Sequence, residues 1–255
     1  MLIDTHCHLN ADQFNEDLNE VIDRALETGV KKMIVVGFDH ETNKRAIELA
    51  HRYDFIYATV GFHPTEAKDI SEKDFEILWN DLQDERVVGI GECGLDYYWD
   101  KEHKEAQDWV FRKQIEWSKK LDLPLIIHMR DATEATYNVL KDYDNLNGIM
   151  HCYSGSKEMV KSFIDLGLHI SLGGPVTFKN AKVPKEVAKI VPSEKLLVET
   201  DSPYLSPHPL RGKRNEPARV RLVAECVADL REVTIEEIEE ITTNNAIKLF
   251  KLGVK

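Results

Sequence analysis

The sequence has little cysteine, glycine and proline, and it contains no long apolar run. Its four cysteines form no C-x-x-C pair and no disulfide-scaffold spacing, which suits a reducing cytoplasm. No apolar stretch approaches the roughly 20 residues of a membrane span, and the chain reaches a charge at Asp4, so we expect neither membrane contact nor a signal peptide. With no Pro/Gly/Ser-rich linker, residues 1–255 are predicted to form one cytoplasmic domain with no obligate protein partner.

The sequence also contains fewer basic than acidic residues. The chain has 33 Lys and Arg against 45 Asp and Glu, a formal net charge of −12. Non-specific nucleic-acid binding over the whole surface needs broad positive potential, so this charge argues against it. It does not exclude an enzyme acting on nucleic acid, because bound metal ions and a local basic loop can supply the positive charge.

Short β-branched runs alternate with longer stretches of helical period. The alternation implies a parallel sheet. Eight evenly spaced strands in 255 residues favour a closed (β/α)8 TIM-type barrel in the α/β class over a doubly wound open sheet. The expected strands are residues 2–8, 32–37, 55–61, 87–92, 124–128, 148–152, 169–173 and 196–199. The expected helices are residues 14–26, 40–53, 71–83, 102–121, 156–166, 184–191, 216–231 and 234–250.

Metal-capable side chains collect at the carboxyl ends of these strands, where the active sites of such barrels lie. In H-x-H on a strand, both imidazoles lie on the same face. Each of these residues alone would be more simply explained as a buried polar group, but their joint placement predicts a metal site. Its expected ligands are His6, His8, Glu92, His128, His151 and Asp201.

Six ligands exceed what one catalytic zinc ion takes, typically three plus water. Two divalent ions fit them better, namely Mg²⁺, Mn²⁺ or Zn²⁺. A bridging carboxylate at Glu92 would hold the ions about 3.5–4 Å apart. Cys7, Cys93 and Cys152 each adjoin a predicted ligand, so we expect them to face away from the barrel interior as apolar filling.

Six motifs give the sequence a family resemblance. They are D-T-H-C-H at 4–8, G-F-H-P at 61–64, G-I-G-E-C-G-L-D-Y-Y at 89–98, P-L-I-I-H-M-R-D-A at 124–132, H-C-Y-S-G at 151–155 and E-T-D-S-P at 199–203. Together they resemble the TatD family of metal-dependent deoxyribonucleases, part of the amidohydrolase superfamily. The match covers nearly the whole chain. Cys93 and Met129 depart from the more usual Ile and Ser, and neither is a ligand position.

The resemblance divides the ligands between two ions. It implies that one metal is held by His6, His8, Glu92 and Asp201. The second would be held by Glu92, His128 and His151. It also implies phosphodiester hydrolysis of DNA, often from the 3′ end, with RNA as the substrate of some members.

A catalytic hypothesis follows for the two carboxylates. A water activated by two metal ions would attack phosphorus, with Asp201 orienting it and accepting its proton, and Glu92 bridging the ions.

Substrate-binding residues are less well defined by the sequence. Arg130 is a candidate for phosphate contact, or for a pair with a local carboxylate. His63 is a candidate for substrate contact or for a structural role. The basic loop with Arg211, Lys213 and Arg214 would grip phosphates, or would simply be solvated.

Two rival functions stay open. The first is a small-molecule amide, lactone or phosphotriester hydrolase of the same superfamily, which a neutral apolar pocket would favour and the basic loop disfavours. The second is a non-catalytic nucleic-acid-binding or scaffold protein with a structural metal. Turnover of a phosphodiester would exclude that second function.

Overall fold

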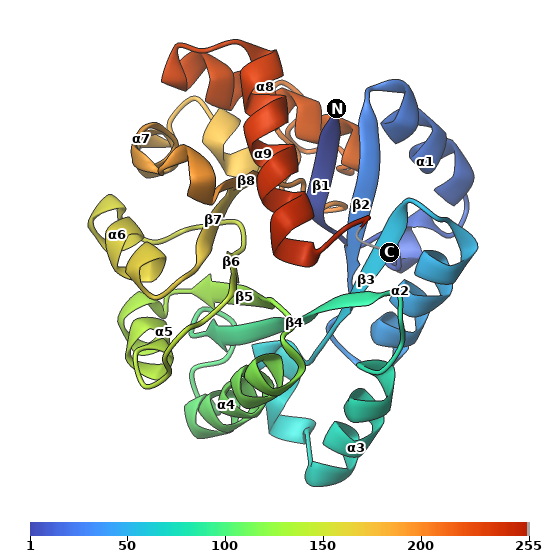
Figure 1. The fold of residues 1–255 in the computed structure, drawn as a ribbon, viewed down its shortest axis with the longest axis vertical. Helices are drawn as coiled ribbons and strands as arrows, with labels where there is room; N and C mark the ends of the chain where they lie inside the picture. Colours follow the sequence, from blue (N-terminus) through green and yellow to red (C-terminus); the bar gives the residue numbers. More distant parts are fainter. Residues whose placement is uncertain (254–255) are drawn as a thin grey trace.

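The computed structural model describes residues 1–253, and in it eight parallel strands run in sequence order around a nearly closed barrel (Figure 1). An isolated parallel bridge joins Cys7, the last residue of the first strand, to Ser202, which follows the last strand. The first and last strands therefore lie side by side. The predicted TIM-type barrel is therefore confirmed. The strands are β1 (Leu2–Cys7), β2 (Val30–Val36), β3 (Ile56–Val60), β4 (Val87–Asp96), β5 (Leu125–Arg130), β6 (Gly148–Met150), β7 (His169–Leu172) and β8 (Leu196–Val198).

Helices fill the connections between strands and surround the sheet (Figure 1). They are α1 (Leu18–Glu27), α2 (His40–Arg52), α3 (Glu72–Asp81), α4 (Lys104–Leu121), α5 (Thr133–Leu140), α6 (Lys157–Asp165), α7 (Lys182–Ile190), α8 (Val220–Arg231) and α9 (Ile235–Phe250). Short 3₁₀ turns are η1 (Asp12–Phe14), η2 (Pro64–Asp69), η3 (Gly174–Thr177), η4 (Ser193–Lys195) and η5 (Pro217–Arg219). Within residues 1–253, no helix has the length and apolarity needed to cross a membrane.

Two predicted strand ends differ from the structure in ways that matter for the site. Strand β4 continues to Asp96, four residues past its predicted end. Strand β6 instead ends at Met150, so His151 and Cys152 lie in the following turn. The prediction of one domain over residues 1–255 stays a prediction, and its last two residues lie outside the described part of the chain.

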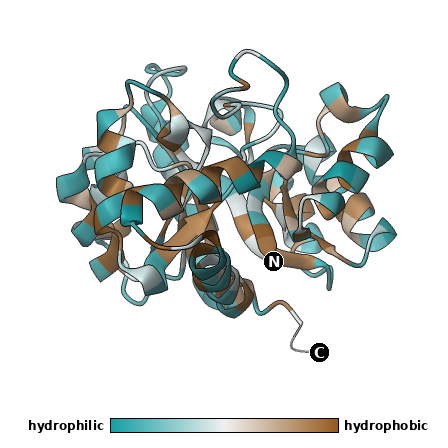
Figure 2. Ribbon diagram, turned by 90° about the horizontal axis from the view of Figure 1, so that it is seen from above, coloured by the Kyte–Doolittle hydropathy of each residue, from teal (hydrophilic) through white to brown (hydrophobic). Residues whose placement is uncertain are grey.

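Apolar side chains form two clusters, and apolar segments lie at the centre of the molecule while the outer helix faces are hydrophilic (Figure 2). The larger cluster packs the helices against the outside of the strands. The smaller one joins strand residues such as Ile3 and Ile126 to Leu249 and Phe250 of α9. Helix α9 packs against β1 and β8, and Asn245 anchors it by donating hydrogen bonds to the carbonyls of Ser193 and Leu196 (2.7 and 2.8 Å).

Candidate functional site

A cavity of about 1300 Å³ opens among the loops that follow the strands. Five of the six predicted metal ligands line it, and His6 is fully buried. Those five are His8, Glu92, His128, His151 and Asp201. His63 and Arg130 line it too, so the structure brings these predicted site residues from separate strand ends to one place.

Four side chains form what we call the first donor group: His6, His8, Glu92 and Asp201. The Nε2 atoms of His6 and His8 lie 3.1 Å apart. The Nε2 atom of His6 lies 3.5 Å from Glu92 Oε2 and 3.7 Å from Asp201 Oδ1. The corresponding distances from His8 Nε2 are 3.6 and 3.5 Å. Two nitrogens and two carboxylate oxygens thus surround one small volume.

The second donor group consists of Glu92, His128 and His151. Glu92 Oε1 lies 2.9 Å from His128 Nδ1 and 3.0 Å from His151 Nε2. The two imidazole nitrogens are 3.4 Å from each other. Because Oε2 of Glu92 faces the first group and Oε1 faces the second, this one carboxylate lies between the two groups.

The distances within the first group can be tested against a metal ion. A tetrahedral ion with bonds of about 2.1 Å holds its ligand atoms about 3.4 Å apart. The nitrogen–nitrogen and nitrogen–oxygen separations of 3.1 to 3.7 Å bracket this value. Imidazole and carboxylate donors also suit Zn²⁺ and Mn²⁺. The residues present therefore fit a divalent ion.

The second nitrogen of three histidines has a partner that orients the ring. His8 Nδ1 donates to the carbonyl of Val36 (2.9 Å). His128 Nε2 lies 2.9 Å from Asp96 Oδ2, and His151 Nδ1 lies 3.1 Å from Glu199 Oε1. With a proton held on that outer nitrogen, loss of any proton on the inner nitrogen leaves a lone pair that faces the donor group. Such partners are typical of metal-ligating histidines.

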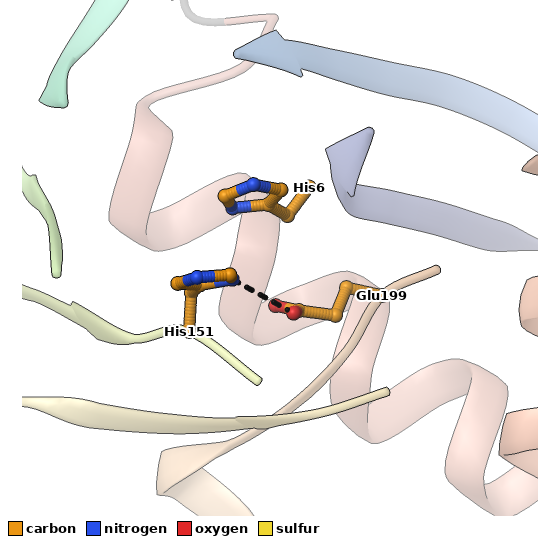
Figure 3. A group of neighbouring side chains, drawn as sticks. All are labelled: His6, His151 and Glu199. Atoms are coloured by element: carbon orange, nitrogen blue, oxygen red, sulfur yellow. Dashed lines mark hydrogen bonds and ion pairs between the residues drawn. The ribbon is translucent and has the colours of Figure 1, made fainter. Parts of the chain in front are cut away.

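His6 lies beside His151, and in Figure 3 only His151 is joined to Glu199 by a hydrogen bond. The ring of His6 stacks on His151 with centroids 4.0 Å apart and an interplanar angle of 15°. Its Nδ1 atom and Oε2 of Glu199 are both buried without a hydrogen-bond partner among the described residues. Glu199 thus binds one histidine directly while one of its oxygens stays unpaired.

Burial and charge determine the protonation of these groups. Burial favours the neutral form of Glu92, but the neighbouring histidines, His151 first, outweigh it and hold the pKa of Glu92 well below its usual range. Asp201 has a lowered pKa because the contact with His8 outweighs its burial. Burial alone would lower the pKa of His128 and His151. The carboxylates Asp96, Glu92 and Glu199 reverse that effect, so both values are raised.

Local backbone features place the ligands. Gly94 has a φ of 136°, and a Cβ there would collide with the carbonyl oxygen of His128, so only glycine lets β4 approach β5 this closely. Across the barrel seam, Asp4 accepts hydrogen bonds from the main chain and hydroxyl of Thr200 (2.9 and 2.6 Å). Asp201 has a φ of 57°, a left-handed conformation that is uncommon outside glycine and recurs at functional sites.

His63 lies on the cavity wall but presents a donor rather than a lone pair. Its Nδ1 accepts a hydrogen bond from the main chain of Thr65 (3.2 Å), so in the neutral ring Nε2 carries the proton. Burial and the nearby His128 lower the pKa of His63 to about 3, which keeps the ring neutral. Its Nε2 atom lies 3.6 Å from Glu92 Oε1. His63 therefore offers an N–H to a ligand in the cavity.

Of the four cationic side chains predicted to bind substrate, only Arg130 lines the cavity. Arg130 stacks on the ring of Tyr98 at 3.9 Å, and no carboxylate of the described chain forms an ion pair with it. Arg214 forms a two-point ion pair with Asp17 (2.8 and 2.6 Å). None of Arg211, Lys213 and Arg214 lines the cavity, and Arg211 packs over Phe178.

Sequence reasoning gave no role to Asp96 and Glu199, although both lie in the motifs. Their spacing could have indicated a role at the site. Glu199 lies two residues before Asp201, and Asp96 lies four residues after Glu92. One prediction was wrong, because Cys152 lines the cavity instead of facing away from it. The alternation of a strand no longer applies to Cys152, whose φ is 38°. Cys7 and Cys93 are buried in the outer core, as predicted.

Comparisons with known proteins agree with this arrangement. A family model described as TatD related DNase matches residues 3–251. A metal-dependent hydrolase named YabD from Bacillus subtilis is 52% identical over 255 residues, which cover 99% of this chain and 100% of the relative. The Escherichia coli metal-dependent hydrolase YcfH is 38% identical over 256 residues, covering 98% of this chain and 96% of the relative. The crystal structure of YjjV, a TatD homologue from Escherichia coli, matches with a TM-score of 0.93 and 32% identity over 98% of each chain.

Proposed function

Since this chain belongs to the family of TatD-related DNases and is a metal-dependent hydrolase, we propose that it hydrolyses phosphodiester bonds of nucleic acid. DNA is the expected substrate, with 3′-to-5′ exonuclease action, and RNA is the alternative. The observation that carries the proposal is Glu92, whose two oxygens face two separate donor groups. That placement suits a pair of ions on the two sides of one phosphoryl group.

The residues that would hold the ions divide as the donor groups do. His6, His8, Glu92 and Asp201 would hold one ion, and Glu92, His128 and His151 the other. When bound, two divalent ions supply Lewis acidity, which lowers the pKa of water and offsets negative charge on phosphoryl oxygens. Mg²⁺, Mn²⁺ and Zn²⁺ are the candidates.

The chain's own groups complete the chemistry. Asp201, kept ionised by its lowered pKa, orients the attacking water and accepts its proton at Oδ. The Nε2–H group of His63 donates a hydrogen bond to a phosphoryl oxygen, where negative charge increases in the transition state.

Phosphates beyond the scissile one are assigned to Arg130, Arg211 and Lys213, and Arg214 would contribute by leaving its pair with Asp17. Neutralising Arg211 and Lys213 should flatten the dependence of log affinity on log salt by roughly 0.7 per lost contact to a single strand. Turnover of a small uncharged ester should not change. An unchanged slope with undiminished nuclease activity would show that this loop is only solvated.

The second candidate function is hydrolysis of a small amide, lactone or phosphotriester. The apolar side chains Val183 and Leu205 on the cavity wall favour it. A purified sample, end-labelled single-stranded DNA and RNA, and added Mg²⁺, Mn²⁺ or chelator would distinguish the two functions. We expect metal-dependent shortening of the strands. Hydrolysis of esters or lactones with intact strands would reject the nuclease.

A cytoplasmic location is part of the proposal. All four cysteines are free, and Cys7 and Cys93 are fully buried thiols with pKa values raised by burial. A chain that works in a reducing compartment needs no disulfide. Fractionation of cells that express the protein would test this, and recovery outside the cytoplasm would reject it.

A further inference from the structure

The exposed apolar side chains of the molecule are concentrated at the cavity. Among residues 1–253, eight large hydrophobic side chains are exposed, and five of them line the cavity. Those five are Tyr98, Trp99, Val183, Tyr204 and Leu205. Trp99 is the most exposed of the eight, at 68%. Exposed apolar groups gathered at one concave site indicate a surface that meets a ligand.

Two of these side chains form an ordered stack with a cation. The Arg130 guanidinium lies 3.9 Å from the centroid of the Tyr98 ring and 5.4 Å from that of Trp99. The rings of Tyr98 and Trp99 meet edge to face at 4.9 Å. Arg130 and Tyr98 thus support the Trp99 indole, which is left open to solvent.

The stack is tied to the second donor group by Asp96. One oxygen of Asp96 accepts hydrogen bonds from the main chain of Tyr98 and of Trp99 (2.9 and 2.8 Å). The other oxygen lies 2.9 Å from Nε2 of His128. A single buried carboxylate therefore fixes the aromatic turn relative to His128, a candidate metal ligand.

The charges nearby complement an anionic ligand. Lys68, Lys101 and Arg130 line the same cavity, in a chain whose net charge is −12. The carboxylate of Asp100 on this wall is occupied, because it pairs with His103 (2.9 Å) and accepts two main-chain hydrogen bonds. Glu102 is the exposed carboxylate of the wall. A flat aromatic surface next to cations matches a nucleotide whose base is unpaired.

We propose that Trp99, supported by Tyr98 and Arg130, is a stacking subsite for one unpaired nucleobase next to the phosphodiester at Glu92 and Asp201. This inference rests on the proposed function and adds a specificity to it. A base inside a duplex has both faces covered by its neighbours, so the subsite selects single strands and frayed ends.

Binding without turnover tests the subsite. The probe is a fluorescein-labelled single-stranded DNA with hydrolysis-resistant phosphorothioate linkages, in the presence of Mg²⁺. Trp99→Ala should weaken binding by roughly 5- to 150-fold, the range that loss of one base–aromatic stack gives. Trp99→Phe should retain most of the affinity. Ile77→Ala is the matched control, because it removes an exposed apolar side chain of α3 outside the cavity.

A scan with abasic nucleotides makes the test specific for a base. In the wild-type protein, removal of the base at one position should weaken binding, whereas in Trp99→Ala the same removal should change nothing further. An unchanged affinity in Trp99→Ala, or equal abasic losses in both proteins, would overturn the subsite. If strands are cleaved and only this result fails, the nuclease proposal stands. If the wild-type protein neither binds nor cleaves a strand, both proposals fall.

Discussion

The two donor groups share Glu92 but hold their histidines differently. In the second group, each histidine is oriented by its own carboxylate, Asp96 for His128 and Glu199 for His151. In the first group, His8 is oriented by a main-chain carbonyl, and His6 Nδ1 has no partner among the described residues. The pKa of His6 is lowered by burial and by the neighbouring His151, whereas nearby carboxylates raise the pKa values of His8, His128 and His151.

This difference suggests that the two donor groups have different roles in metal binding and in proton transfer. The second group has three carboxylates around two imidazoles, a negative charge that suits a bound cation. The first group has a carboxylate, Asp201, on the cavity wall, where it can exchange a proton with water. We infer that the second group anchors and that the first group carries the proton transfer.

The largest effects should come from the two inner carboxylates. Glu92→Gln should reduce the occupancy of both ions, because a neutral amide bridges cations poorly. Asp201→Asn should leave the ion of the second group in place yet lower turnover by at least roughly 10²–10⁴, the contribution of a positioned proton acceptor. Metal content per chain and kcat would be measured on both variants. Equal loss of both ions in the two variants would show that the roles are divided wrongly.

The outer carboxylates should give the next largest effects. Asp96→Asn and Glu199→Gln should each weaken binding of the anchored ion by about 10- to 100-fold, the usual cost of losing an outer partner. Asp74→Asn is a matched control, since Asp74 pairs with His40 (2.8 Å) and not with a histidine of either donor group. Titration with Mn²⁺ would measure the affinities. If Asp96→Asn and Asp74→Asn behave alike, the orienting role of Asp96 is wrong.

The effect of pH on metal binding should be graded rather than all-or-none. An ion must displace the protons of His128 and His151, whose raised pKa values keep them protonated above the ordinary histidine value of about 6.5. The affinity of the second group should therefore rise with pH through those values and fall on acidification. The slope should be up to a factor of about 10 per pH unit for each proton displaced. A pH-independent affinity near neutrality would contradict the assignment.

Much of the fold and the inner site followed from the sequence, because strand ends of a parallel barrel meet at one rim. The period-two spacing of His6 and His8 was enough to place their Nε2 atoms together. The two carboxylates that orient His128 and His151 could not be predicted in the same way. Asp96 could be placed only once β4 was known to continue to that residue, and Glu199 only once His151 had left its strand.

Local backbone conformation and contacts between residues distant in sequence explain why Cys152, Arg214 and Arg130 could not be placed from the sequence. Cys152 enters the cavity because its backbone is left-handed, which no residue pattern signalled. Arg214 pairs with Asp17, a contact nearly 200 residues distant in sequence that depends on how η5 packs on α1. The stack of Arg130 on Tyr98 likewise needs the register of β4 against β5, in which Asp96 pairs with Arg130.

The central claim is that Glu92 lies between two metal ions held by two different donor groups. A crystal structure of the protein grown with Mn²⁺, with anomalous scattering recorded at the manganese edge, tests it most directly. We expect two anomalous peaks on opposite sides of the Glu92 carboxylate, one contacting His6, His8 and Asp201 and the other contacting His128 and His151. A single peak, or ions bound away from Glu92, would contradict it.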